Sequence, residues 1–109
     1  KINEIKSADR LLQDGEIIKE SELLFEVIHV PGHSPGSVCF YSKENHVVFS
    51  GDVIFPYSIG RTDLPVADQE LLINSIKSKI LQLPENTVIY CGHGTTTTVG
   101  FESVNNPFF

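Results

Sequence analysis

The alternation of apolar and polar residues predicts strands over the first half of the chain and one long helix in the second. Short apolar runs that end at Gly, Pro, Asn or Asp are typical of β-strands. The runs of this kind are Glu16–Glu20, Leu23–Val30, Val38–Ser42, Val47–Phe49 and Thr87–Cys91. The second run is apolar on both alternating faces, with Leu24 and Phe25 on opposite sides. We therefore expect this strand to be covered on both faces.

Apolar residues at three- and four-residue steps predict a helix over Asp68–Leu83. The residues of this stripe are Leu72, Ile73, Ile76, Ile80 and Leu83. Asp68 is a suitable N-cap, and Pro84 stops the helix beyond its last turn. We expect the threonines at 95–98 to form a loop that caps a short final helix near Val99–Val104. Residues 1–14 show no sustained period and are predicted to be a connector.

Strands, then a helix, then a strand predict an α/β or α+β fold. With 109 residues, the chain is one domain or part of one. It starts at Lys1 and contains no methionine, which we interpret as a translation start that lies upstream or has been removed.

Composition excludes some partners. A hydrophobic fraction of 40% with 20% charged residues is ordinary for a globular protein. The net charge of −6 argues against a nucleic-acid surface, and no apolar run approaches the roughly 18 residues that span a membrane. Cys39 and Cys91 lie inside apolar runs, which favours buried thiols in a cytoplasmic protein over a disulfide.

A metal-competent side chain follows three of the strand-like runs, each time next to glycine. These are His33 in Pro31–Gly36, Asp52 in Ser50–Asp52, and His93 in Gly92–Gly94. Because strands of one sheet end along common edges, these side chains can meet in space although they are far apart in the sequence. His and Asp are ligand types that suit zinc or iron.

Together with two further segments, these motifs resemble the metallo-β-lactamase-fold hydrolases, and among them the short glyoxalase II-like (hydroxyacylglutathione hydrolase-like) enzymes. The further segments are Ser58–Asp63 and the tail Gly100–Glu102 with Asn106–Phe108. The resemblance covers Asp14 to the last residue, but the family's first metal motif, His-x-His-x-Asp-His, is absent. It therefore implies that residues 1–109 are the C-terminal half of an αββα sandwich, with a mixed sheet and helices on one face.

The resemblance also implies the chemistry. His33 would bind the first of two metal ions, His93 the second, and Asp52 both, as the catalytic bridging group. Zinc is the expected metal, with iron or manganese as alternatives. The substrate would be a small thioester, attacked by a water whose pKa two ions lower from about 15.7 toward 7. The remaining ligands would come from the absent half, so we expect this chain alone to be inactive and to bind metal weakly or not at all. Its partner would be that half or another copy of the chain.

Other residues are open to more than one interpretation. Arg61 and Asp63 would brace the loop beside the metals or contact substrate, and Tyr57 shares that loop. His29 and His46 match no motif and are interpreted as a strand residue and a surface-turn residue.

Glu102 and Asn106 are interpreted as C-terminal capping or packing groups.

Two rival functions also remain. One is a persulfide dioxygenase-like oxidoreductase with one iron, whose relatives share the Gly-Arg-Thr-Asp loop. The other is a non-catalytic interaction fragment.

Overall fold

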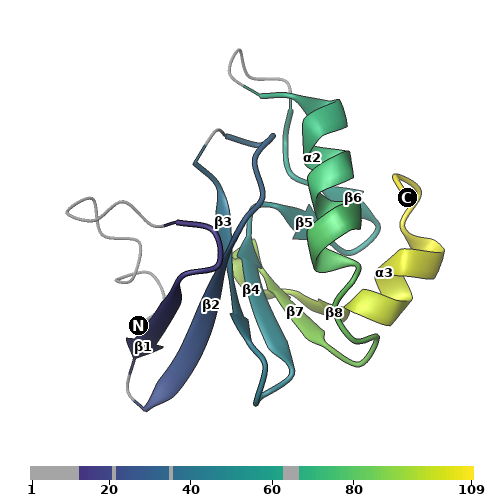
Figure 1. The fold of residues 1–109 in the computed structure, drawn as a ribbon. Helices are drawn as coiled ribbons and strands as arrows, with labels where there is room; N and C mark the ends of the chain where they lie inside the picture. Colours follow the sequence, from purple (N-terminus) through teal and green to yellow (C-terminus); the bar gives the residue numbers. More distant parts are fainter. Residues whose placement is uncertain (1–12, 21, 35, 63–66) are drawn as a thin grey trace.

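In the part of the chain that the structure describes, a six-stranded mixed sheet packs against two α-helices (Figure 1). The computed structural model describes residues 13–20, 22–34, 36–62 and 67–109, so most of the predicted connector lies outside the described residues. The elements, in order, are β1 (Ile17–Glu20), β2 (Leu23–His29), β3 (Val38–Ser42), β4 (Val47–Gly51), β5 (Ile54–Phe55), β6 (Ser58–Ile59), α2 (Gln69–Ser75), η1 (Ile76–Ile80), β7 (Val88–Cys91), η2 (Gly92–Gly94), β8 (Thr96–Thr98) and α3 (Val99–Asn105).

Strand direction decides which strand ends share an edge. The sheet order is β1-β2-β3-β4-β7-β8, and β5 and β6 form a separate two-stranded hairpin. Strands β2 and β4 are both antiparallel to β3 and therefore run in the same direction. Strand β7 pairs parallel with β4. The C-terminal ends of β2, β4 and β7 consequently point to the same edge of the sheet.

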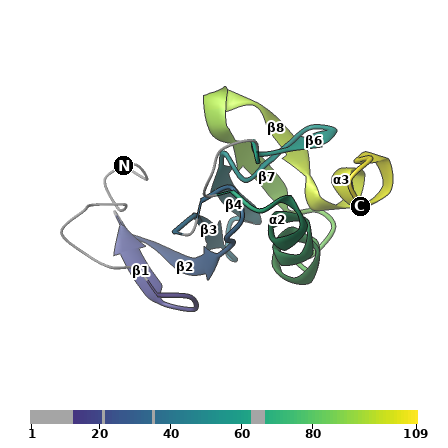
Figure 2. The same ribbon diagram turned by 90° about the horizontal axis from the view of Figure 1, so that it is seen from above.

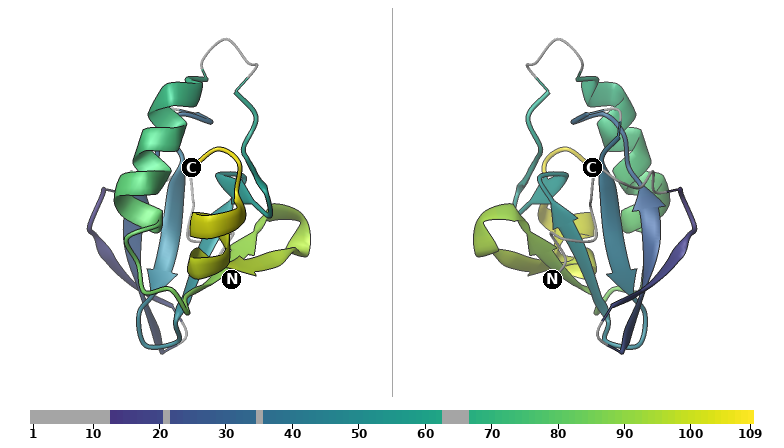
Figure 3. Two further views of the ribbon diagram at one scale, coloured as in Figure 1. Left: turned by 90° about the vertical axis from the view of Figure 1, so that its right-hand side faces the viewer. Right: turned by 90° about the vertical axis from the view of Figure 1, so that its left-hand side faces the viewer.

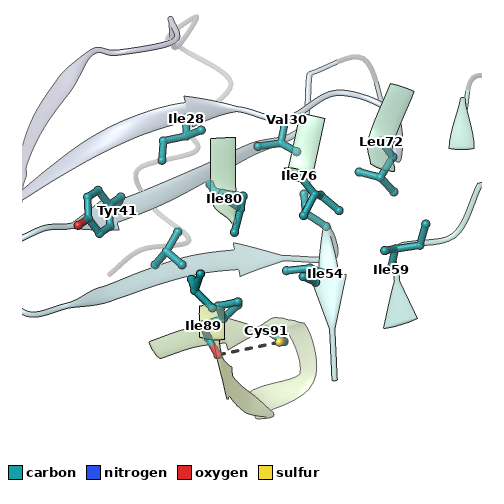
Figure 4. Packing of buried hydrophobic residues seen from close by; sticks show 14 residues of the cluster. Ile28, Val30, Tyr41, Ile54, Ile59, Leu72, Ile76, Ile80, Ile89 and Cys91 are labelled. Atoms are coloured by element: carbon teal, nitrogen blue, oxygen red, sulfur yellow. Dashed lines mark hydrogen bonds between the residues drawn. The ribbon is translucent and has the colours of Figure 1, made fainter. Parts of the chain in front are cut away.

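The two faces of the sheet carry two apolar clusters. The main cluster joins side chains of β2, β3, β4 and β7 to the helices and to the β5–β6 hairpin, and Figure 4 shows Ile54 and Ile59 of that hairpin in it beside Leu72 and Ile76. The second cluster, on the other face, contains Ile18, Phe25, Val27 and Phe40, with Val38 and Phe49 packed against it. The prediction that β2 is covered on both faces is thus confirmed for its C-terminal part, but Leu24 near its start is exposed.

The long helix is confirmed, with one change in its geometry. Asp68 caps it through a hydrogen bond from the Leu71 N–H, and the predicted stripe is buried or partly buried. From Ile76 the helix widens to a π-helical turn, where the Leu81 N–H donates to the Ile76 carbonyl at 2.9 Å. Periodicity alone predicts a helix and carries no signal for this wider turn. Both α2 and α3 pack buried residues into the main cluster, so the helices lie on one face as predicted (Figure 2).

The predicted loop at 95–98 is wrong for Thr96–Thr98, whereas the predicted cap of the final helix is confirmed, since the Thr98 hydroxyl accepts from the Phe101 N–H at 3.1 Å. Residues Thr96–Thr98 form β8, which pairs antiparallel with β7 and leads directly into α3 (Figure 3). Threonine is β-branched and suits a strand when a partner edge is available. Here that edge is β7, whose position in the sheet is a tertiary property that no local pattern contains.

Both cysteines are buried thiols outside any disulfide, as predicted. Burial raises the pKa of the Cys91 thiol; hydrogen bonds with Thr95 and Ser50 oppose this rise, and the nearby Glu102 carboxyl adds to it. Among the helices of the described residues, none is long and apolar enough to cross a membrane.

Candidate metal centre

Asp52 and His93 lie side by side because β4 and β7 are parallel neighbours. Phe49 pairs with Tyr90, and after a shift in register Gly51 pairs with Cys91. The residues that follow the two strands therefore lie at the same edge of the sheet. The Asp52 Oδ1 and His93 Nε2 atoms are 4.0 Å apart. Both side chains are largely exposed to solvent. The structure thus places an imidazole and a carboxyl group together at an open strand edge.

A tight turn presents Asp52. The Val53 N–H donates to the Ser50 carbonyl at 3.0 Å, and Gly51 has a φ of +53°, a conformation that glycine adopts without strain. Buried Ser50 donates from its hydroxyl to the carbonyls of Ile54 and Tyr90, which ties the turn to both neighbouring segments. The Asp52 carboxyl group itself is exposed to solvent in this chain.

His93 adopts a backbone conformation that is rare for a residue with a side chain. Its φ is +66° and ψ is +14°, in the left-handed region, between Gly92 and Gly94. Such strain is typical of functional sites that the surrounding structure holds in place. The Phe55 ring stacks near the imidazole, with centroids 6.2 Å apart and an interplanar angle of 22°. The hairpin therefore forms one wall beside His93.

His33 is held by a backbone carbonyl from a distant loop. Its Nδ1 lies 2.9 Å from the Arg61 carbonyl oxygen, which can only accept, so Nδ1 carries the proton. The other ring nitrogen, Nε2, is then the one with a lone pair for a ligand. A carbonyl that fixes the tautomer in this way is the usual support of a metal-binding histidine.

Glycine at position 60 lets the three segments approach each other. A Cβ there would collide with the Asp52 carbonyl oxygen and lie 3.2 Å from His33 Nδ1. Gly60 thus lies between the loop of His33 and the turn of Asp52, and its N–H donates to the Val53 carbonyl at 2.9 Å. The His33 ring therefore lies near the backbone of the segment that carries Asp52.

The donor set fits a metal site that this chain builds only in part. Within the described ranges, no group of three or more His, Cys, Asp or Glu side chains stands close enough to hold a metal ion. His33 Nε2, Asp52 and His93 nevertheless offer the nitrogen and oxygen donors that zinc or iron takes. A site completed by other donors agrees with this arrangement.

The remaining predicted residues are less central. The Arg61 side chain is exposed, and its backbone carbonyl makes the contact with His33. Tyr57 is exposed, has a φ of +64°, and meets the Phe101 ring edge-on at 5.4 Å. Asp63 lies outside the described residues. His29 ends β2, and His46 lies exposed in the β3–β4 turn, as predicted.

Sequence reasoning missed the β5–β6 hairpin and the role of Phe55. The only sequence signal was the short apolar run from Val53 to Phe55, which ends at a proline. A two-residue strand has too few positions for alternation to be recognised.

We expect Gly92→Ala to displace the Asp52 carboxyl group at a modest cost in stability. A Cβ at position 92 would lie 2.5 Å from Asp52 Oδ1, the movable end of a side chain, and 3.1 Å from the Gly51 carbonyl oxygen. In the full-length protein, zinc affinity measured by chelator competition should fall about tenfold, while the thermal midpoint changes by only a few degrees. Gly36→Ala is the control, since nothing lies within 4 Å of its new Cβ. Unchanged zinc affinity in Gly92→Ala would contradict the placement of Asp52 at the metal.

Comparisons of the sequence with family profiles and with known proteins point to the same family. The profile of the metallo-beta-lactamase superfamily matches residues 1–93. The chain is 49% identical over 96 residues to the hydroxyacylglutathione hydrolase GloC of Haemophilus influenzae, covering 88% of this chain and 45% of that protein. It is 48% identical over 104 residues to the probable metallo-hydrolase YqgX of Bacillus subtilis, covering 94% and 49%. The chain thus spans about half the length of the curated relatives it matches.

Solved structures agree with this result. The BLEG-1 B3 metallo-beta-lactamase superposes with a TM-score of 0.86 at 51% identity, covering 93% of this chain and 48% of that one. TTHA1623 in a di-iron-bound form gives 0.83 at 47% identity, covering 92% and 48%. ETHE1 from Myxococcus xanthus gives 0.82 at 29% identity, covering 88% and 44%.

Proposed function

This chain belongs to the metallo-beta-lactamase superfamily, and from that premise we propose that the intact protein is a metal-dependent hydrolase of hydroxyacyl-glutathione-type thioesters. The observation that carries the proposal is the edge where Asp52 and His93 lie 4.0 Å apart and the Arg61 carbonyl holds His33 Nδ1. The GloC relative, named as a hydroxyacylglutathione hydrolase, supports the substrate class.

We assign each residue a role in this chemistry. His33 through Nε2, Asp52 and His93 would hold zinc, and the other ligands would come from the half of the protein that this chain lacks. Zinc held by these residues would supply a water with a pKa lowered toward about 7 and a positive charge for the substrate's carbonyl oxygen. Hydrolysis adds water across the C–S bond and yields a carboxylic acid and a thiol. Because a thiolate is a good leaving group, no side chain of this chain is needed as a general acid.

The partner in this proposal is the N-terminal half or a second copy of the chain. The face with Phe25 and Phe40 is an apolar sheet face, and its Phe49 ring stacks on Tyr90 at 5.3 Å. Tyr90 remains 45% exposed, which leaves an aromatic surface for a second layer to cover. We also propose a cytoplasmic location, which the burial of Cys39 and Cys91 in the apolar core supports.

An iron oxidoreductase is the second candidate. The rival of the sequence analysis is a persulfide dioxygenase-like enzyme with one iron, which shares the Gly-Arg-Thr-Asp sequence of residues 60–63 by resemblance. The structural likeness to a di-iron-bound protein supports iron as an alternative metal, without bearing on the number of iron ions. A non-catalytic interaction fragment is the third candidate.

The test is metal analysis and turnover of the full-length protein. We expect about two equivalents of zinc per chain and release of free thiol from a hydroxyacyl-glutathione thioester, without oxygen uptake. Oxygen consumption with a glutathione persulfide would favour the iron enzyme, and hydrolysis of a chromogenic β-lactam in place of the thioester would change the substrate class. If the full-length protein contained no metal and showed no turnover, the non-catalytic interaction fragment would be the remaining candidate.

We expect the isolated 109-residue chain to bind zinc at least about 100-fold more weakly than the full-length protein, because each lost ligand removes binding free energy. Zinc-specific chelator competition on both proteins, with folding of the short chain checked by circular dichroism, measures this ratio. Equal affinity would show that the chain completes the site by itself.

A further inference from the structure

We propose that Glu102 of helix α3 and Asn106, the C-cap of that helix, are positioning residues that hold the β5–β6 hairpin against the two metal-competent histidines. This inference rests on the proposed metal site. The inference gives α3 and its C-cap a role in shaping the metal site, although neither Glu102 nor Asn106 is itself a metal ligand in the proposal.

Glu102 is a fully buried carboxyl group whose oxygens are occupied by donors from three segments. Its Oε1 accepts from the Tyr57 N–H at 2.9 Å and from Asn106 Nδ2 at 2.9 Å, and its Oε2 accepts from the Thr97 hydroxyl at 2.6 Å. A buried carboxyl group is costly unless it is hydrogen-bonded, so this arrangement is a specific one. Of the three donors, Tyr57 belongs to the turn of the hairpin.

Asn106 fixes the hairpin from the same side. Its Nδ2 also lies 3.0 Å from the Ser58 carbonyl and 3.5 Å from the Phe55 carbonyl, one on each strand of the hairpin. Its Oδ1 accepts from the Phe108 N–H at 3.0 Å, which holds the amide in this orientation. The side chains of Glu102 and Asn106 therefore contact both strands of the hairpin and the turn between them.

The hairpin in turn contacts both histidines. Phe55 of β5 stacks on the His93 ring, and β6 runs through Gly60 to Arg61, whose carbonyl binds His33 Nδ1. Glu102 and Asn106 are therefore linked through this hairpin to His33 and His93, which follow two different strands. If Glu102 and Asn106 served only to cap or pack α3, their hydrogen bonds with the hairpin would not be needed.

The experiment compares Glu102→Ala with Glu102→Gln in the full-length protein. Glutamine keeps the Oε1 acceptor, and its amide can donate to the Thr97 hydroxyl, so the hairpin should stay in place. Alanine removes every acceptor. We expect Glu102→Ala to weaken zinc binding by about tenfold, the usual size for loss of a group that orients a ligand, and to change the absorption spectrum of the cobalt-substituted protein. Glu102→Gln should stay within about twofold of wild type.

Two controls separate positioning from general loss of stability. Ser103→Ala is on the same helix, and its hydroxyl donates only to the Val99 carbonyl within that helix. Ile80→Ala destabilises the main apolar cluster at the end of η1, where Ile80 is fully buried. Both should keep wild-type zinc affinity. Equal loss of affinity in Ile80→Ala and Glu102→Ala, or full affinity in a folded Glu102→Ala, would overturn the inference.

Hydrogen exchange does not depend on metal binding and can be used if Glu102→Ala folds poorly. It also tests the anchoring of the hairpin separately from the proposed metal-dependent function. Asn106→Ala removes only the Asn106 contacts, and hydrogen exchange of the Gly60 amide, which bonds to the Val53 carbonyl, reports whether the hairpin is held. We expect faster Gly60 exchange in Asn106→Ala than in Ser103→Ala, and unchanged exchange would overturn the anchoring. If wild type binds neither zinc nor cobalt, the proposed function itself fails, whatever the exchange shows.

Discussion

Asp52→Asn should reduce kcat/KM of the full-length protein for the thioester by at least about 100-fold, equivalent to about 2.7 kcal/mol of transition-state stabilisation. The substitution keeps the shape of the side chain and removes its negative charge. Asp52 lies 4.0 Å from His93 and follows a turn that Ser50 holds, so the amide would occupy the same position without the charge that attracts a cation. Bound zinc, measured by elemental analysis, should fall in parallel.

The fold should not change in this variant, because the Asp52 side chain is largely exposed. Asp68→Asn provides the matched control: it makes the same chemical change at an exposed N-cap, where asparagine caps as well as aspartate. We expect Asp68→Asn to keep both turnover and zinc content. Full turnover in Asp52→Asn would remove the carboxyl group from the mechanism.

Gly32→Ala should destabilise the fold by more than about 3 kcal/mol. Gly32 has a φ of +131°, which residues with a side chain rarely adopt, and a new Cβ would lie 2.5 Å from the backbone N and Cα atoms of Leu72. Leu72 is fully buried on α2, and the Gly32 carbonyl accepts from the Asp68 N–H at 2.7 Å at the start of the same helix. The helix cannot move away without breaking the core, so the collision cannot be relieved cheaply.

Urea unfolding of the full-length protein, followed by circular dichroism, measures this effect, and Gly36→Ala in the same loop is the control. Position 36 has open space around its Cβ and no left-handed φ. The contrast with Gly92→Ala is instructive, since there the obstacle is the end of a side chain and here it is helix backbone. Equal urea midpoints for Gly32→Ala and Gly36→Ala would contradict the packing of this loop on α2.

The sequence by itself determined the local features of this protein. Apolar alternation predicted the five longer strands, and the stripe that includes Leu72 and Ile76 predicted the helix, because both periods are properties of the nearby chain. Glycine residues next to His33, Asp52 and His93 marked the ends of three apolar runs. These three side chains could meet at one edge only if the three strands ran in the same direction.

The tertiary structure alone decided that direction and the contacts behind the site. Parallel pairing of β4 with β7 brings Asp52 to His93, and the hydrogen bonds from Tyr57 to Glu102 and from Asn106 to Ser58 join positions 45 and 48 residues apart. No periodicity or spacing encodes such pairs, because their formation depends on how whole elements pack. The same reason explains why Thr96–Thr98 forms a strand: its partner edge exists only once β7 is in the sheet.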